Sequence, residues 1–225
     1  MTLFATEDTM AKQYNELTFS EDDIKHKIYQ NMIGSGRQWQ ERGKMQLDFM
    51  VAAGLKSHHI FIDIGCGPLR AGEYFIKYLD PSCYIGFDYS QGYIDVAQYM
   101  INHNDLLKSK NPLVIRCDLF DLMDQCSHPL ADFGLAFSVL NQCQRGYVQA
   151  FFDNMGKSFK PGAKIYVMND NMKWYPKWLL HSNLMVTQTF QNLDSFSINV
   201  RERLGRASRQ MVNRNDNFLI ELTKQ

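Results

Sequence analysis

From residue 59 onward, short apolar runs alternate with stretches of helical periodicity, and this alternation constrains the fold most strongly. The strand signal is carried by residues 60–64, 83–87, 113–115, 133–137 and 163–168. Between the fourth and fifth runs, apolar side chains recur at helical spacing, at Val148, Phe151, Phe152, Met155 and Phe159. Strands that alternate with helices form βαβ units, which build a parallel sheet with helices on both faces. The sequence therefore predicts an α/β fold.

The two ends of the chain have different patterns. Apolar residues four apart predict a short amphipathic helix at Ile24, Ile28 and Met32. Residues 34–43 break that pattern, and residues 45–55 indicate a second helix. We therefore interpret residues 1–55 as an N-terminal helical cap or lid, and residues 56–225 as one globular domain. Near the C-terminus, residues 195–200 alternate and residues 218–222 are apolar, which predicts two antiparallel strands that end the sheet.

Composition narrows the classes of function. With 24 basic and 24 acidic residues the formal net charge is zero, which does not favour a protein whose main work is to bind nucleic acid. The five cysteines follow no metal-ligand spacing and indicate free thiols in a reducing compartment, the cytoplasm. The first residues are polar and do not form a signal peptide, and no run of eighteen apolar residues predicts a membrane span.

The first apolar run leads into a glycine loop, FIDIGCGPLRAG at residues 61–72. Ligands of parallel α/β sheets bind at the carboxyl ends of the strands, so this loop is the candidate binding element. The dinucleotide motif requires its third glycine where Arg70 stands, and the phosphate-loop motif requires a terminal Gly-Lys-Ser/Thr that is absent. Neither of these phosphate-binding motifs matches.

Five segments in order resemble class I S-adenosylmethionine-dependent methyltransferases. They are the glycine motif at 63–67, Asp88 after the second run, residues 117–119 after the third, residues 132–140 along the fourth, and the Lys-Pro-Gly turn at 160–162 before the fifth. The resemblance covers roughly residues 58–170 and implies a Rossmann-like, seven-stranded, mostly parallel sheet with an antiparallel final strand. One departure is that Leu69 stands where that family often has a third glycine.

The resemblance implies S-adenosylmethionine as the cofactor and assigns roles to residues. Asp88 would accept hydrogen bonds from the ribose hydroxyls, and Asp118 would lie near the adenine amino group. Arg70 is expected either on the surface, paired with Glu73 or Asp80, or at the carboxylate of the cofactor or of an acidic substrate. The full expected set is Asp63, Gly65, Gly67, Arg70, Asp88, Tyr89, Asp118, Leu119, Ser138 and Trp39, the last as part of the lid.

The acceptor and the general base are less constrained. Residues 138–141 lack the Asp/Asn-Pro-Pro-Tyr/Phe motif of enzymes that methylate amino groups of nucleic acid bases. The chain also lacks the Pro-Cys pair that is usual in enzymes whose cysteine nucleophile attacks cytosine. Asp170 and Asn171 resemble part of a divalent-metal site, but no matching acid follows Phe137, so we predict no metal. In-line methyl transfer needs a base only when the acceptor is protonated. His181 is our candidate, with Asp170, Tyr175 and Asn141 as alternatives.

We therefore expect a methyltransferase that acts on oxygen or nitrogen of a small or medium-sized metabolite, without a nucleic acid or membrane partner. One alternative is an RNA or protein methyltransferase that uses the arginine cluster at residues 201–214. Another alternative is a non-catalytic protein that keeps the fold and binds a partner. The glycine loop and Asp88 count against this last alternative.

Overall fold

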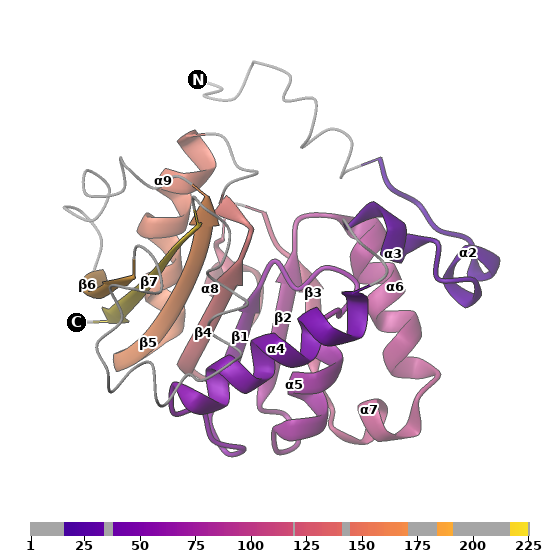
Figure 1. The fold of residues 1–225 in the computed structure, drawn as a ribbon, viewed down its shortest axis with the longest axis horizontal. Coiled ribbons are helices and arrows are strands. Elements are labelled where there is room, and N and C mark those ends of the chain that lie inside the picture. The colour runs from indigo at the N-terminus through magenta and orange to yellow at the C-terminus, as the bar shows by residue number, and fades with distance from the viewer. Residues whose placement is uncertain are drawn as a thin grey trace.

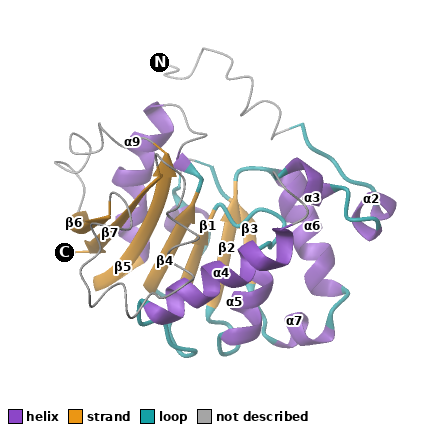
Figure 2. Ribbon diagram, in the orientation of Figure 1, coloured by secondary structure: helices purple, strands orange, loops and turns teal. Residues whose placement is uncertain are grey.

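The computed structural model describes residues 16–33, 38–118, 120–140, 145–170, 184–190 and 217–224 (Figure 2). Its strands are β1 (Phe61–Ile64), β2 (Tyr84–Asp88), β3 (Leu113–Arg116), β4 (Ala131–Phe137), β5 (Phe159–Asp170), β6 (Leu184–Phe190) and β7 (Asn217–Lys224). They form one seven-stranded sheet in the order β3-β2-β1-β4-β5-β7-β6. Strands β1 to β5 are parallel, and β7 runs antiparallel between β5 and β6. The predicted fold class is confirmed.

Helices cover both faces of this sheet (Figure 1). They are α2 (Glu21–Lys25), α3 (Tyr29–Met32), α4 (Trp39–Ala52), α5 (Gly72–Tyr78), α6 (Gln91–Asn102), α7 (Asp105–Ser109), α8 (Leu122–Gln125) and α9 (Arg145–Asn154), the last continued by the short 3-10 helix η3 (Met155–Ser158). Helices α4 to α7 pack on the face that carries Phe61, and α8 and α9 pack on the face that carries Ile62. Successive side chains of β1 therefore serve two separate cores, because strand residues alternate between faces.

The N-terminal helices differ from the sequence prediction in two ways. The helix expected over Ile24 to Met32 is broken, because Lys27 has a left-handed backbone with φ of 58°. Tyr29 is buried instead of Ile28, which is exposed. Helix α4 begins at Trp39, so the predicted break over residues 34–43 was wrong from residue 39 onward. A glycine inside a helix costs about 1 kcal/mol, yet α4 continues through Gly43 because this position packs against the glycine loop.

Two strand predictions also needed correction. The sixth strand lies at Leu184–Phe190, and the predicted strand at residues 195–200 lies outside the described residues. A register shift between Val186 and Gln188 interrupts the alternation that would have marked β6 in the sequence. Residues 160–162, predicted as a turn, lie within β5, where the pairing moves from Ala131–Phe159 to Phe133–Lys164. Strand β7 agrees with the prediction for residues 218–222.

Candidate functional site

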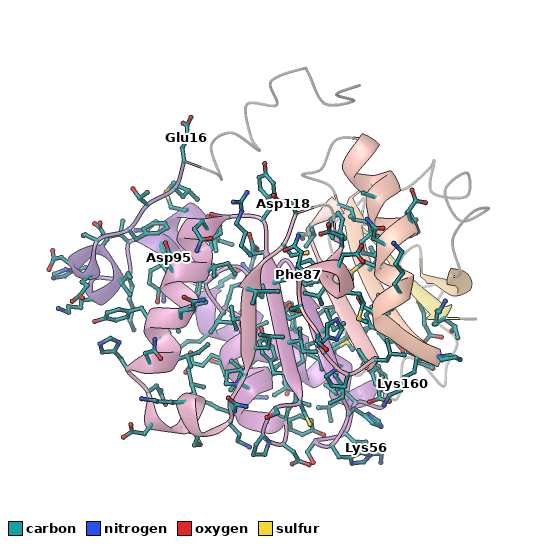
Figure 3. All side chains as sticks on the ribbon, turned by 180° about the vertical axis from the view of Figure 1, so that it is seen from behind. Glu16, Lys56, Phe87, Asp95, Asp118 and Lys160 are labelled. Atoms are coloured by element: carbon teal, nitrogen blue, oxygen red, sulfur yellow. The ribbon has the colours of Figure 1, made fainter. Side chains whose placement is uncertain are left out.

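The parallel register brings the ends of β1, β2 and β3 to one edge of the sheet. Asp63 pairs with Gly86, and Asp88 pairs with Arg116, so the loops that follow these strands are neighbours. Figure 3 places Asp118 at this edge and Lys56 and Lys160 at the opposite edge. We call the first the carboxyl edge and the second the amino edge. The predicted cofactor residues of β1 to β3 therefore gather at the carboxyl edge.

The glycine loop after β1 has three residues with left-handed backbones. Gly65, Gly67 and Leu69 have φ values of 71°, 52° and 60°. The carbonyl of Phe87 accepts hydrogen bonds from the N–H groups of Gly65 and Cys66, both at 2.9 Å, which ties the loop to the end of β2. Leu69 is fully buried and keeps the backbone conformation for which glycine is favoured. The leucine that departs from the family motif thus has a left-handed backbone in this chain.

The two loop glycines are required for different reasons. A Cβ atom at Gly65 would lie 2.5 Å from Cγ2 of Val139, which follows β4, so only glycine leaves room for that side chain. At Gly67 a Cβ atom would meet only Cδ1 of Ile33, at an ordinary 3.5 Å, and the requirement is the positive φ alone. Val139 and Ile33 therefore border the loop from β4 and from the N-terminal helices.

Asp88 connects the glycine loop to the next helix. Its Oδ2 accepts a hydrogen bond from Gly67 N, and its Oδ1 accepts one from Ser90 N, both at 2.9 Å. Ser90 caps α6, with its Oγ accepting a hydrogen bond from Tyr93 N. Burial raises the pKa of Asp88, although hydrogen bonds from the backbone of the two loops oppose that shift. A carboxylate has about four lone-pair positions, so Asp88 retains capacity for a further donor.

Asp63 lies beneath the loop in a drier environment. It is 4% exposed, and its Oδ2 accepts a hydrogen bond from the Tyr84 hydroxyl at 2.9 Å. Desolvation raises the pKa of Asp63 to about 7, an effect that the Tyr84 hydrogen bond opposes and the negative charge of Asp88 strengthens. Asp63 and Tyr84 therefore form a buried pair below the glycine loop.

Arg70 belongs to the glycine loop, and its guanidinium lies near Phe137 at the end of β4. Its Cζ lies 5.9 Å from the centroid of the Phe137 ring, within range of a cation–π contact. Desolvation and the charge of Arg42 lower its pKa to about 10, and Asp63 opposes that shift. No hydrogen bond or ion pair to the Arg70 guanidinium occurs in the described parts of the chain. The predicted surface pairs with Glu73 and Asp80 are not formed, and Glu73 pairs with Lys77 instead.

Tyr89 and Asp118 are joined by Arg116, a residue that sequence reasoning missed. Arg116 Nε donates to the Tyr89 carbonyl at 3.2 Å, and its Nη2 donates to both carboxylate oxygens of Asp118, at 3.1 and 3.2 Å. Its Cζ also lies 5.7 Å from the centroid of the Tyr89 ring. The only sequence signal is that Arg116 is the last residue of β3, directly opposite Asp88.

Of the remaining predicted residues, the structure describes Trp39 and Ser138. Trp39 is 7% exposed and packs edge-on against Tyr29 at 5.6 Å, in a cluster with Ile24 and Val96, which leaves little of its surface for a ligand. Ser138 follows β4 with a left-handed φ of 57°. Leu119 and His181 lie outside the described residues, as do Asn141, Tyr175 and the arginine cluster.

The N-terminal segment lies directly on this edge. A Cβ atom at Gly92, in the first turn of α6, would be 2.2 Å from the Leu17 carbonyl oxygen, and one at Gly43 would be 2.0 Å from that of Arg70. Phe19 stacks on Tyr93 with ring centroids 6.0 Å apart. Helix α4 also contributes Phe49 and Met50 to the main core. The segment therefore packs against the first turn of α6 and against the glycine loop.

The described ranges contain neither a cluster of metal-ligating side chains nor a membrane-spanning helix. Among them, no three or more His, Cys, Asp or Glu side chains gather as a metal site would require. No helix in the same ranges is long and apolar enough to cross a bilayer. The four cysteines that the structure describes are free thiols.

Comparison with known proteins identifies the fold. No protein-family model and no curated protein matches this sequence. A TehB-like SAM-dependent methyltransferase from Corynebacterium glutamicum has a TM-score of 0.60 at 15% identity, with 91% of this chain and 97% of that chain covered. Magnesium protoporphyrin IX methyltransferase from Synechocystis, with bound SAM, has a TM-score of 0.61 at 15% identity, with 99% and 100% covered.

A third solved structure carries a different name. The [4+2]-cyclase SpnF has a TM-score of 0.55 at 14% identity, with 80% of this chain and 81% of that chain covered. The fold therefore also occurs in a protein named for another reaction, and the chemistry has to be argued from the site. The chain has the Rossmann-like fold of the class I S-adenosylmethionine-dependent methyltransferases.

Proposed function

We propose that this protein is an S-adenosylmethionine-dependent methyltransferase that acts on oxygen or nitrogen of a small or medium-sized metabolite. The observation that carries the proposal is the place of Asp88. It stands at the end of β2, its two oxygens hold the N–H groups of Gly67 and Ser90, and it retains acceptor capacity. A carboxylate held in this way suits a pair of hydroxyl donors, such as the two on a ribose ring.

The residues around Asp88 suit the other parts of the cofactor. The Arg70 guanidinium, which makes no ion pair among the described residues, suits the cofactor carboxylate. Tyr89 and Asp118 lie on the adenine side of the ribose position, and Asp118 offers an acceptor to an amino group. Asp63 holds the loop from below through Tyr84. The donor and acceptor types at each position therefore fit S-adenosylmethionine.

When bound, S-adenosylmethionine supplies a methyl group on a positively charged sulfur, which a nucleophile attacks in line. The chain has to orient the acceptor and exclude water, and a base is needed only for a protonated nucleophile. Ser138 follows β4 and Asp170 ends β5, and these strand ends are where we expect the acceptor to enter. His181 remains our candidate base.

The acceptor class rests on charge and on named neighbours. A net charge of zero favours a metabolite over a nucleic acid. Magnesium protoporphyrin IX and mitomycin appear in the names of two methyltransferases that share the fold. We also propose a cytoplasmic location, on the basis of the free thiols, and a lid function for residues 1–55.

The test is calorimetric titration of the purified protein with S-adenosylmethionine, S-adenosylhomocysteine and NAD. We expect micromolar binding of the two sulfur compounds and none of NAD. Asp88→Ala should weaken that binding by about 1.5–3 kcal/mol, the scale for loss of a charged hydrogen-bond acceptor. Asp95→Ala is the control, because Asp95 is an exposed carboxylate on α6 that bonds to Gln91.

Four results would contradict the proposal. Binding of NAD alone would change the cofactor class. Equal affinity of the wild type and Asp88→Ala would remove Asp88 from the site. Binding of S-adenosylmethionine without methyl transfer to any member of a metabolite panel, or to RNA or protein, would support a non-catalytic protein. Transfer to RNA with a steep dependence on salt would move the acceptor class to nucleic acid.

A further inference from the structure

We propose that Arg116 is a positioning residue that makes the cofactor pocket specific for purines with an amino group at C6. It would do so by holding the Asp118 carboxylate in a fixed orientation as a hydrogen-bond acceptor. This inference rests on the proposed function, because it assumes that the adenine ring of S-adenosylmethionine lies beside Asp118. It assigns a role to Arg116, a residue that would contact neither the methyl group nor the ribose and would act through Asp118.

Every described contact of the Arg116 guanidinium goes to the loops that follow β2 and β3. Its Nε donates to the Tyr89 carbonyl at 3.2 Å, in the loop that begins at Asp88. Its Nη2 reaches both oxygens of Asp118, at 3.1 and 3.2 Å, across the neighbouring loop. Arg116 therefore links Tyr89, which follows the carboxylate expected at the ribose, with Asp118, which is expected at the adenine amino group.

The contacts of the Arg116 guanidinium fix the orientation of Asp118. A guanidinium only donates hydrogen bonds, so both oxygens of its partner carboxylate act as acceptors. An ionised carboxylate can only accept hydrogen bonds. Because Nη2 is shared by the two oxygens, lone pairs remain on both for an incoming amino group. An oxo group at C6 has no proton to donate and would face the carboxylate with its own lone pairs.

Stability alone gives little reason for this arrangement. The Arg116 and Asp118 side chains are 41% and 48% exposed, and ion pairs with such exposure contribute little to folding. The guanidinium also lies over the Tyr89 ring, which limits the positions that it can occupy. An exposed side chain with four directed contacts at the edge of a binding site is better explained by what those contacts orient.

The experiment compares S-adenosylhomocysteine with S-inosylhomocysteine, which carries an oxo group at C6, by calorimetry on the full chain. Arg116→Met removes the donor while it keeps the length of the side chain. We expect it to weaken S-adenosylhomocysteine binding about tenfold, the upper range for one hydrogen bond, and to change S-inosylhomocysteine binding by less than about twofold. Arg116→Lys keeps the charge without the planar fork and should fall between the two.

Two further variants complete the design. Asp118→Asn offers an amide N–H to the oxo group, so the preference for the amino purine should shrink or reverse. Lys44→Met removes another exposed ion pair, with Asp48 on α4, and should leave both affinities unchanged. The melting temperature of each ligand-free variant is measured in parallel, and Arg116→Met should melt as the wild type does because its ion pair is exposed.

Each outcome decides one of the two proposals. A fall in the ratio of the two affinities in Arg116→Met, with an unchanged melting temperature, supports the positioning role. An equal loss for both ligands, or no loss for either, overturns it and leaves the proposed function standing. If the wild type binds neither ligand, the proposed function fails, and the role of Arg116 fails with it.

Discussion

The two edges of the sheet carry carboxylates with similar partners and different remaining capacity. At the amino edge, Asp132 Oδ2 accepts from Ile60 N at 2.9 Å and its Oδ1 accepts from Lys160 Nζ at 2.7 Å. At the carboxyl edge, Asp88 accepts from two backbone N–H groups and has no cation in an ion pair among the described residues. Asp132 is therefore neutralised by Lys160, whereas Asp88 is bonded to backbone N–H groups and is not neutralised by a cation among the described residues.

Their pKa values follow this difference. Partial burial raises the pKa of Asp132, but the Lys160 and Ile60 hydrogen bonds outweigh it and bring the pKa below its ordinary value. For Asp88 burial prevails over the backbone hydrogen bonds, and the pKa is raised. A carboxylate that is less stable as an anion in the protein alone gains more from an external donor. The amino edge thus neutralises its carboxylate with Lys160, whereas the carboxyl edge leaves Asp88 without a cation among the described residues, as the proposed ligand site requires.

The largest expected difference lies between two glycines with similar backbones. Gly65 at the carboxyl edge and Gly162 at the amino edge have φ of 71° and 82°. Alanine at residue 162 meets nothing within 4 Å, so Gly162→Ala should cost only the left-handed backbone, about 1 kcal/mol. Gly65→Ala adds the 2.5 Å overlap with Val139 and should cost about 2–4 kcal/mol in total.

Urea unfolding of both variants, with cofactor titration beside it, measures this difference. Gly65→Ala should also lose more than about tenfold in cofactor affinity, because the loop has to move away from Val139, whereas Gly162→Ala should bind normally. A double variant, Gly65→Ala with Val139→Ala, should recover part of the lost affinity because the overlap is relieved. Equal effects of the two single variants on binding would break the distinction between the edges.

The sequence could reveal the positions of Gly65 and Asp88 because parallel strands end at a common edge. Once residues 61–64 and 84–88 are recognised as strands, their register brings the residues that follow them together. The resemblance to a known family then supplied their roles. Asp118 and Tyr89 were reached by the same reasoning, since they follow β3 and β2.

What the sequence could not reveal depends on contacts between distant residues. The contact between Gly43 and the Arg70 carbonyl, and that between Gly92 and the Leu17 carbonyl, join segments whose spacing carries no periodic signal. The fork of Arg116 depends on a side-chain direction that a strand pattern does not give. Lys27 has a left-handed backbone that breaks the expected first helix, and nothing in the identity of a lysine within a helical pattern indicates such a break.

An intermediate effect is expected in the pH dependence of stability. The folded-state pKa of Asp63 is about 7, above the ordinary 3.8, so between these values the folded protein keeps a proton that the unfolded chain has released. Stability should therefore fall as pH rises through this window, by up to about 1.4 kcal/mol per pH unit from this group. Asp88, whose pKa is also raised, adds to the same trend.

Asp132 acts with the opposite sign, because its pKa is lowered and its contribution is lost only as pH falls below the ordinary value. Urea unfolding from pH 4 to pH 8 separates the two edges. Asp63→Asn, which stays neutral and can still accept from Tyr84, should flatten the fall, and Asp132→Asn should keep it. Parallel curves for the wild type and Asp63→Asn would show that Asp63 is ionised in the folded protein throughout this range.

The smallest expected effect is that of Lys160→Met at the amino edge. The Lys160 side chain is 47% exposed, so loss of its ion pair with Asp132 should change stability by less than about 1 kcal/mol. The change is still readable at His59, whose pKa is lowered first by desolvation and further by Lys160. An NMR titration should show that pKa rise in the variant, while cofactor affinity stays the same. A loss of affinity would mean that the amino edge also serves the ligand site, although Lys160 and Asp118 lie at opposite ends of the sheet in Figure 3.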